Sequence, residues 1–392
     1  MKSLILQKPS DKMQKTKWII YCIILCSLLF SCQNKEEKEK ELIIDPHPNA
    51  IKVYDWLKEI QLPNGLLESS ENSNFVSLYD NSLASMVFIA KGDIARAESI
   101  LDFFNGRINS ELLSGNGGFC QFRDRTGIPF GNHWLGDNAW LLMAINTYKA
   151  KTGNTKYEPL AQALSAWIRS LQDTDGGIKG GFDSNGSGIG KVTEGMIDAF
   201  NAIPGYDNFH KNLLSYLKNN RWDATEKLLI SWPGNKYAYA LDNFSWGYCA
   251  FSDFPSGVLQ KADMFLTNCT TTVTNSQLTG YCFDIDKDGV WLEGTGEMVV
   301  AFQKAGQTAK AEFFLTEMEK LLVPGTLFPS TLGIPYASNM GTGYATDPLW
   351  IGADTKPCIS SGAWYLFGVL QFDPFTAGYI KNVPSSDKFW LN

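Results

Sequence analysis

The feature that most constrains the fold of this chain is a set of glycines, each of which follows a helix-like apolar stretch. A glycine just beyond a helix can adopt the left-handed conformation that closes the last turn. A second helix-like stretch follows within a few residues, so each unit is predicted to be a helical hairpin. The units recur roughly every 50 to 60 residues, a period typical of arrays built from one supersecondary unit. The glycines are Gly92, Gly153, Gly205, Gly257 and Gly306.

The two helices of each predicted hairpin differ in where their apolar residues lie. The first is apolar nearly all round, as in Ala139–Ile145, Met298–Phe302 and Ala363–Leu370, and such a helix is buried on all sides. The second has apolar residues at intervals of three or four, as in 94–104 and 157–171, which predicts one exposed face. This alternation predicts an inner ring of buried helices inside an outer ring of amphipathic helices.

The ends of the chain indicate that the array closes on itself. A last buried helix at about Ser360–Leu370 has no partner after it, and an early amphipathic helix at Ala50–Ile60 has none before it. An open solenoid needs polar end caps, and the last helix is too apolar to be one. We therefore expect a single all-α domain over 47–392, an (α/α)6 toroid of six helical hairpins with a buried inner ring and an amphipathic outer ring.

The first residues predict export and a lipid anchor rather than part of the fold. Residues 1–32 place lysines before the apolar run Trp18–Phe30, which is too short to span ~30 Å of hydrocarbon as a helix, and end in Ser31-Cys32. This lipobox-like ending predicts acylation of Cys32, although an ordinary signal peptide with a chance cysteine would look similar. Residues 33–46 read as a charged tether. The expected location is the bacterial cell envelope, lipid-anchored, on its periplasmic face or outer surface.

Charge and ligand spacing argue against several partners. The net charge is −7 and lysines cluster only near the N-terminus, so nucleic-acid binding is not expected. The three histidines lack metal-ligand spacing. Asp284, Asp286 and Asp288 have the spacing of a calcium loop, but Thr295 occupies the position of its final acid, so a solvated turn is favoured over calcium. No cofactor or metal is expected.

Acidic residues recur just ahead of the predicted inner helices, next to Gly, Asn or an aromatic residue. The inner helices of a closed ring run in the same direction, so their N-termini gather at one mouth and bring these acids together. Such a concave mouth is the default place for a binding site. Asp capping of helix ends is the alternative explanation. The acids are Asp80, Asp137, Glu194, Asp242 and Glu293.

Several strings around these acids resemble the six-hairpin glycosidase-like superfamily, and in particular its bacterial (α/α)6-barrel proteins of poorly assigned substrate. The similarity runs from about Asn49 to Phe375, and Gly195 departs from it where similar proteins often carry a polar side chain. The resemblance implies cleavage of glycosidic bonds by paired carboxylates. The strings are Gly136-Asp137-Asn138-Ala139-Trp140, Thr193-Glu194 with Asp198-Ala199-Phe200, Trp291-Leu292-Glu293-Gly294-Thr295, Ser361-Gly362-Ala363-Trp364 and Phe372-Asp373-Pro374-Phe375.

Glycosidic cleavage needs one protonated and one ionised carboxyl group, and crowding of acids raises the pKa of one of them. Asp137 and Glu293 are the expected catalytic pair, with Asp80 and Glu194 next. Aromatic rings near the acids fit sugar stacking, with core filling as the alternative, above all for Trp140 and Trp246. The expected substrate-binding residues are Trp134, Trp291, His133, Asp242, Tyr344 and Trp350.

The sequence leaves three functions open. The first is a glycoside hydrolase acting on a poly- or oligosaccharide, and the second is a non-catalytic glycan-binding lipoprotein. The third is a polysaccharide lyase or epimerase on the same toroid, which needs a Tyr or His base. His133, close to Asp137 in sequence, keeps the third open.

Overall fold

The computed structural model describes residues 46–234, 238–340, 343–344, 347–348 and 355–391. The signal-like segment, Cys32 and nearly all of the predicted tether lie outside the described residues. The chain divides into two units after Pro48, and the second, Asn49–Asn392, contains the fold described below. Among the described residues, the helices are all too short or too polar to cross a membrane.

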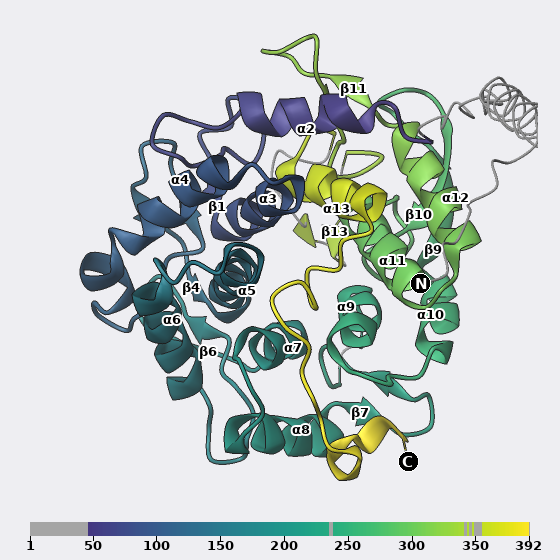
Figure 1. The fold of residues 1–392 in the computed structure, drawn as a ribbon. Coiled ribbons are helices and arrows are strands. Elements are labelled where there is room, and N and C mark those ends of the chain that lie inside the picture. The colour runs from purple at the N-terminus through teal and green to yellow at the C-terminus, as the bar shows by residue number, and fades with distance from the viewer. Residues whose placement is uncertain (1–45, 235–237, 341–342, 345–346, 349–354, 392) are drawn as a thin grey trace, which may run out of the picture. The chain divides into compact units, whose positions relative to one another are not determined.

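Among the residues that the structure describes, six inner helices form a closed ring (Figure 1). Each packs against the next, and α13 packs against α3, which closes the circle. Nearly all their residues are buried, as their apolar sequences predict. The inner helices are α3 (Leu78–Lys91), α5 (Leu135–Thr152), α7 (Thr193–Ala202), α9 (Asp242–Ala250), α11 (Leu292–Lys304) and α13 (Ile359–Leu370).

In the described part of the chain, six outer helices surround the ring, and each packs mainly on one inner helix. The first outer helix packs on α13, so the two ends of the domain form the sixth pair, as predicted. The outer helices α6 and α8 bury one face and expose the other. The outer helices are α4 (Ile94–Asn105), α6 (Glu158–Ser170), α8 (Asn208–Asn220), α10 (Gly257–Lys261), α12 (Thr308–Glu319) and α2 (Ala50–Glu59).

Four of the five predicted glycines follow an inner helix in the left-handed region. Gly92, Gly153, Gly205 and Gly306 have φ of 79°, 69°, 79° and 70°. The prediction for Gly257 is wrong, because this residue begins α10 instead of ending α9. The preceding Pro255-Ser256 explains the error, since proline disrupts a helix interior and is tolerated near its start.

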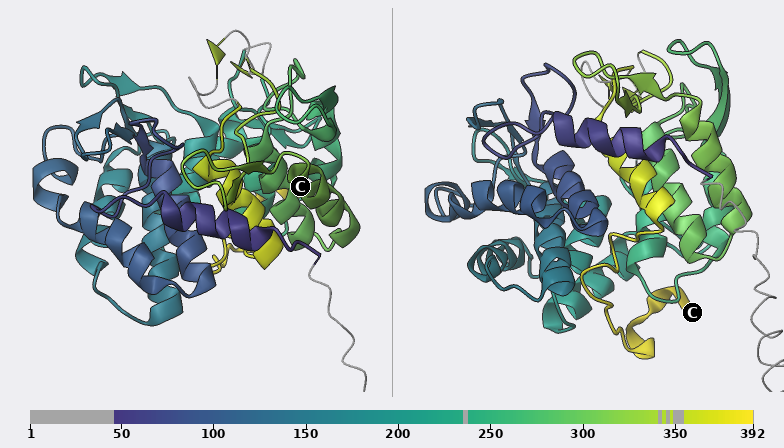
Figure 2. Two further views of the ribbon diagram at one scale, coloured as in Figure 1. Left: turned by 90° about the horizontal axis from the view of Figure 1, so that it is seen from above. Right: turned by 45° about the horizontal axis from the view of Figure 1, so that its top comes forward.

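Short antiparallel strands lie in the loops and gather on one side of the ring (Figure 2). Two sheets have three strands and the others have two. The three-stranded sheets are β1 (Val76–Ser77), β2 (Phe122–Arg123) and β3 (Pro129–Phe130), and β4 (His133–Trp134), β5 (Gly181–Phe182) and β6 (Gly188–Ile189). The pairs are β7 (Trp222–Asp223) with β8 (Leu228–Leu229), β9 (Leu266–Thr270) with β10 (Gln277–Tyr281), β11 (Val323–Pro324) with β12 (Leu332–Gly333), and β13 (Gly343–Tyr344) with β14 (Asp347–Pro348).

The segment after α13 seals one end of the ring, where the inner helices finish. The ring centroid of Phe375 lies 5.3 Å from that of Trp140 and 6.1 Å from that of Trp246. Lys381 Nζ donates to the carbonyl of Ile203, just past α7, at 2.6 Å. The opposite end, where the inner helices begin, remains open.

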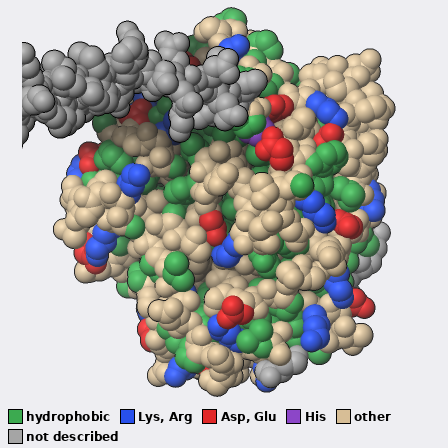
Figure 3. Space-filling view, turned by 45° about the vertical axis from the view of Figure 1, so that its right-hand side comes forward, with side chains coloured by type: hydrophobic (Ala, Val, Ile, Leu, Met, Phe, Trp, Pro, Cys, Tyr) green, Lys and Arg blue, Asp and Glu red, His purple; other side chains and the backbone are tan. Residues whose placement is uncertain are grey.

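The charges on one face of the molecule are mixed. On the face shown in Figure 3, Lys and Arg side chains are interspersed with Asp and Glu side chains. A mixed surface of this kind lacks the clustered positive charge on which phosphate binding depends.

Candidate active site

The open end of the ring holds a cavity of about 260 Å³. It is lined by first-turn residues of the inner helices, together with residues of the loops around them. All five acids predicted from the sequence line this cavity, and Asp198 lines it as well. The ring therefore brings together Asp80 of α3, Asp137 of α5, Glu194 of α7, Asp242 of α9 and Glu293 of α11.

The helix starts explain why the acids reach the cavity. The cap of α3 is Ser77, whose Oγ accepts the amide N–H of Asp80 at 3.3 Å, and Trp134 and Leu241 hold the N-cap positions of α5 and α9. The acids of these helices lie in the first turn instead. The capping explanation for Asp80, Asp137 and Asp242 is therefore wrong as an account of the N-cap positions.

The asparagine after the acid fixes the loop behind it. Asn138 accepts the amide N–H of Phe119 at 2.9 Å and donates to the carbonyl of the same residue at 3.0 Å. Asn81 makes the same two bonds to Leu67, at 2.8 and 3.0 Å. In each Asp-Asn pair the acid faces the cavity, whereas the amide ties the preceding loop to the helix start.

Glycines in the motifs make room for the acids. A Cβ at Gly136 would lie 3.0 Å from Oδ2 of Asp198, so glycine lets α5 and α7 bring their acids close together. A Cβ at Gly294 would overlap the ring of Trp291. Gly195, where similar proteins often carry a polar side chain, packs against Leu135.

Several cavity acids are buried without enough protein partners. Asp80, Asp198 and Asp242 are 1%, 1% and 6% exposed. Within the described part of the chain, one buried carboxyl oxygen of each has no hydrogen-bond partner, and the same holds for Oε2 of Glu194. Buried polar atoms left in this way are costly, so these oxygens need a ligand, water or protonation.

Burial shifts the titration of these groups. Desolvation raises the pKa of Asp137, Glu194 and Glu293 to about 7 each. The pKa values of Asp80 and Asp242 rise well above their ordinary values, first through burial and then through the charges of neighbouring acids. At neutral pH the cavity therefore holds both protonated and ionised carboxyl groups, as general acid and base chemistry requires.

Aromatic rings form the floor and walls. Trp140 and Trp246 lie 5.3 Å apart between centroids at the floor, and both are buried and line the cavity. They therefore fill the core and face the site at once. Trp134 and Trp291, predicted to bind substrate, line its walls. The ring of Trp291 packs 5.1 Å from that of Phe283.

One predicted binding residue, His133, lies outside the cavity, and the predictions for Tyr344 and Trp350 are not tested. His133 precedes Trp134 on β4, and consecutive strand residues point to opposite faces, so His133 lines a separate hollow. There its Nε2 lies 3.4 Å from Sγ of Cys120. The backbone of Tyr344 lies in β13, and Trp350 lies outside the described residues.

Sequence reasoning missed two acids one turn further along the inner helices. Asp198 follows Glu194 by four residues, and Glu297 follows Glu293 by four. Glu297 is buried, and its Oε2 accepts the hydroxyl of Ser245 at 2.8 Å. Residues four apart share a helix face, so this spacing was the available signal. Of the two acids, Asp198 lines the cavity, and the cavity residues that were not predicted also include Tyr79, Gln121 and Tyr336.

The acidic loop before α11 is tied together internally. Oδ1 of Asp284 accepts the amide N–H of Asp286 at 2.9 Å. Cys282, Asp286 and Asp288 bring three possible ligand atoms within 4.8 Å of one another. Burial raises the pKa of the Cys282 thiol to about 12, which favours the neutral thiol over the thiolate that a metal would bind. A turn stays the predicted role of this loop.

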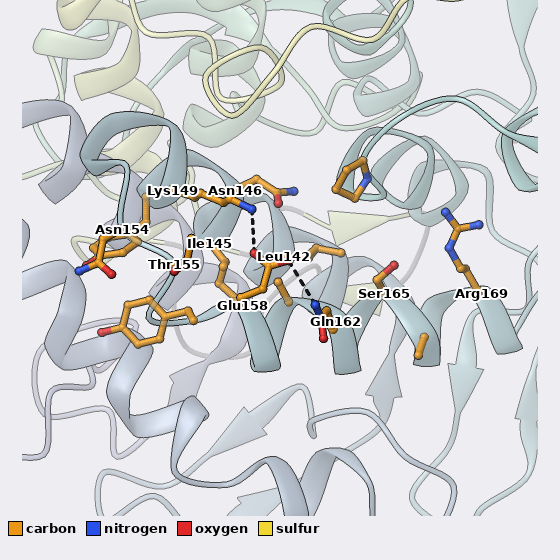
Figure 4. A pocket seen from close by; sticks show the side chains of 15 residues that line it. Leu142, Ile145, Asn146, Lys149, Asn154, Thr155, Glu158, Gln162, Ser165 and Arg169 are labelled. Carbon is orange, nitrogen blue, oxygen red and sulfur yellow. Dashed lines mark hydrogen bonds and ion pairs between the residues drawn. The ribbon is translucent and has the colours of Figure 1, made fainter.

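A larger hollow of about 410 Å³ lies between α5 and α6 (Figure 4). Its charged groups all have partners, because Lys149 donates to Glu158 at 2.7 Å and Arg169 pairs with Asp207 at 2.9 Å. Gln162 also donates to Glu158, at 3.4 Å. No acid predicted from the sequence lines it within the described residues. The acid cavity, and not this hollow, is the candidate site.

The fold and the site together define the class of protein. It is a closed (α/α)6 toroid with acidic residues clustered at its open end. No protein-family profile and no curated protein matches the sequence. Among solved structures, it is similar to a glycosidase at a TM-score of 0.59 and 13% identity, covering 84% of this chain and 97% of that one.

Two further structures share the fold. A sugar epimerase from a ruminal bacterium has a TM-score of 0.55 at 11% identity, covering 81% of this chain and 95% of that one. An inactive α-1,6-mannanase of Salegentibacter sp., with α-1,6-mannotriose, has a TM-score of 0.52 at 12% identity, covering 84% and 100%. These likenesses show the fold, and they confirm at that level the resemblance indicated by the sequence motifs.

Proposed function

We propose that this protein is a glycoside hydrolase that cleaves a poly- or oligosaccharide in the acid cavity. One observation carries the proposal: carboxyl groups converge from five inner helices onto an aromatic-floored cavity, and within the described residues buried carboxyl oxygens on α3, α7 and α9 lack a hydrogen-bond partner. Sugar hydroxyls can both donate to and accept from carboxyl groups, and sugar rings stack on indoles. Solved structures with this fold include a glycosidase with glucose and a mannanase with mannotriose.

Asp137 and Glu293 are the best candidates for the reacting pair. In the ring order α3, α5, α7, α9, α11, α13, the helices α5 and α11 are opposite, so the two acids enter the cavity from opposite sides. A sugar bound between them would meet a proton donor on one side and a carboxylate on the other. The donor protonates the leaving oxygen, while the carboxylate activates water or attacks the anomeric carbon.

The remaining acids interact electrostatically with the reacting pair and position the sugar. The charges of Glu293 and Asp137 raise the pKa of Asp80 after the larger effect of its burial. Burial also raises the pKa values of Asp198 and Asp242, which favours the protonated carboxyl group that can donate to sugar oxygens. Their carboxyl groups would position the sugar while Asp137 and Glu293 exchange protons with it.

The lining favours a neutral sugar. Among the described residues that line the cavity, none is Lys, Arg or His. Ionised carboxylates without a neighbouring cation repel a sugar that carries a carboxylate or sulfate. A lyase acting on an acidic sugar needs a group that neutralises the sugar carboxylate, so this lining disfavours that alternative.

A glycan panel with product analysis by mass tests the proposal. Hydrolysis adds one water for each bond cleaved, and Asp137→Asn or Glu293→Gln should abolish it while the fold is kept. A wild-type protein that binds glycans, shown by thermal stabilisation, but cleaves none would identify a glycan-binding protein instead.

Sugar epimerisation is the second candidate, because sugar epimerases share the fold. Epimerisation requires a base that removes a carbon-bound proton. Tyr79 and Tyr336 line the cavity, whereas His133 lines another hollow. A product of unchanged mass with altered chromatographic mobility would favour epimerisation over hydrolysis.

We also propose that Cys32 is acylated and anchors the protein in the bacterial cell envelope. The lipobox-like Ser31-Cys32 after a charged and apolar leader supports this. Cys32→Ala should move the protein from the detergent phase to the aqueous phase on partitioning. Recovery of both forms in the aqueous phase would contradict the anchor.

A further inference from the structure

Three phenylalanines form an aromatic platform at the rim of the acid cavity, called here the Phe ledge: Phe75, Phe122 and Phe130. Their ring centroids lie 4.6 Å (Phe75–Phe122), 5.9 Å (Phe122–Phe130) and 6.0 Å (Phe75–Phe130) apart. Phe130 is 44% exposed, and the other two are half-buried. An aromatic cluster left open to solvent beside a site is a candidate contact surface.

The Phe ledge is continuous with the cavity. Phe122 and its neighbour Gln121 line the cavity wall. In the sheet, Phe122 pairs with Ser77 of β1 on one side and with Phe130 of β3 on the other. Aromatic surface therefore runs from inside the cavity, through Phe122, to the exposed ring of Phe130.

The hairpin that carries the Phe ledge is held in place. Arg123 alternates with Phe122 and is 1% exposed, and its guanidinium forms a 2.5 Å ion pair with Glu111. Oδ1 of Asp124 accepts the amide N–H groups of Thr126 and Ile128 at 2.8 and 3.0 Å, which fixes the turn. A ligand that stacks on this ledge would not have to order it first.

The size of the cavity requires such a continuation for a long substrate. Its volume of about 260 Å³ lies below the roughly 300–1,000 Å³ of pockets that enclose a drug-sized ligand. A cavity of this size has room for only the end of a sugar chain, and further residues of a longer chain would leave over the rim. Sugar rings present C–H faces that pack on aromatic rings.

We propose that the Phe ledge binds the sugar residues next to those held in the cavity, and that the preferred substrate is a chain of several neutral sugars rather than a disaccharide. This inference rests on the proposed carbohydrate function of the cavity. It adds the length of the substrate and the residues that select it.

Phe130→Ala tests the inference on oligosaccharides of increasing length, taken from the glycan that the panel identifies. The kcat/KM should fall about three- to tenfold on the longest chains, through KM, and stay unchanged on the disaccharide. The matched control is Phe313→Ala on α12, which removes another exposed ring (47% exposed) away from the cavity. Thermal unfolding of both variants checks that they fold.

The outcomes separate this inference from the proposed function. Equal kcat/KM of Phe130→Ala and wild type at every chain length would overturn the Phe ledge and leave hydrolysis standing. If no glycan is cleaved, binding of the neutral oligosaccharides of increasing length in the panel is measured instead. A length-dependent loss of binding in Phe130→Ala then supports the ledge without hydrolysis, and binding that is absent or unaltered overturns it.

Discussion

The two ends of the ring are built from the same six helices, yet they carry opposite chemistry. At the open end, the described residues place six carboxyl groups and no basic side chain around a cavity. At the sealed end, Lys381 donates to the carbonyls of Ile203 and Gly205 at 2.6 and 2.8 Å, and Lys304 donates to that of Cys249. Helix N-termini favour anions and C-termini favour donors and cations, so helix direction contributes to this sorting, although burial lowers the pKa of Lys381 to about 7.

This difference between the two ends assigns stability to the sealed end and chemistry to the open end. The lysines at the sealed end satisfy carbonyl groups that the helices leave over, so they hold the ring together. The acids at the open end have too few partners and shifted pKa values, so they make the fold less stable than it could be. Strain of this kind at a site is expected where groups are arranged to act on a ligand.

The largest expected effect is on activity, when an acid at the open end of the ring is neutralised. Asp137→Asn and Glu293→Gln should each lower kcat by about 10²–10⁴-fold, because each removes a proton donor or acceptor from the reaction. Initial rates of product formation measure this. The thermal midpoint should stay the same or rise, since a buried charge is removed. A variant that keeps full activity is not part of the reacting pair.

The pH dependence of stability sharpens the comparison. The folded pKa of Asp137 is about 7, above its ordinary value of 3.8, so the folded state binds more protons between these limits. The stabilisation of the folded state by protonated Asp137 is complete below about pH 4, and it is lost as the pH rises through 7. For Asp137 it is on the order of 2–4 kcal/mol.

Urea unfolding from pH 4 to 8 measures this loss, and Asp137→Asn should flatten the profile. A wild-type protein whose stability rises over this range would show that the acids of the open end are paired or hydrated instead.

The sealed end should respond in the opposite way. Lys381→Met removes two hydrogen bonds to carbonyl groups and should cost about 1–3 kcal/mol of unfolding free energy, with little change in kcat. Urea unfolding and initial rates on the same sample measure both. A large loss of activity at unchanged stability would mean that the two ends are coupled.

The fold could be predicted because the burial of each helix determines the spacing of apolar residues in its sequence. The alternation of all-apolar and one-sided helices required two concentric layers, and the unpaired helices at 50–60 and 360–370 required closure. Gly257 misled because a glycine after Pro255-Ser256 starts a helix as readily as it ends one. Local sequence alone does not separate the two cases.

The site was predictable only where an acid stands at the border between loop and helix. Asp198 and Glu297 lie inside apolar helices, and their role depends on which face meets the cavity. His133 was assigned to the cavity because it is close to Asp137 in sequence, but on a strand of two residues it points away from the side on which Trp134 lines the cavity. Contacts across the ring decide such cases, and they involve residues far apart in the chain.

The pairing of α2 with α13 has a consequence for how the molecule forms. The first helix of the domain, α2, packs on α13 near the C-terminal end of the domain, so the ring can close only after nearly the whole chain has been synthesised. Contacts between such distant parts of a chain form slowly. Until α13 has folded onto them, α3 and α11 each expose an apolar face. A circular permutant whose new ends lie between two hairpins should therefore fold faster.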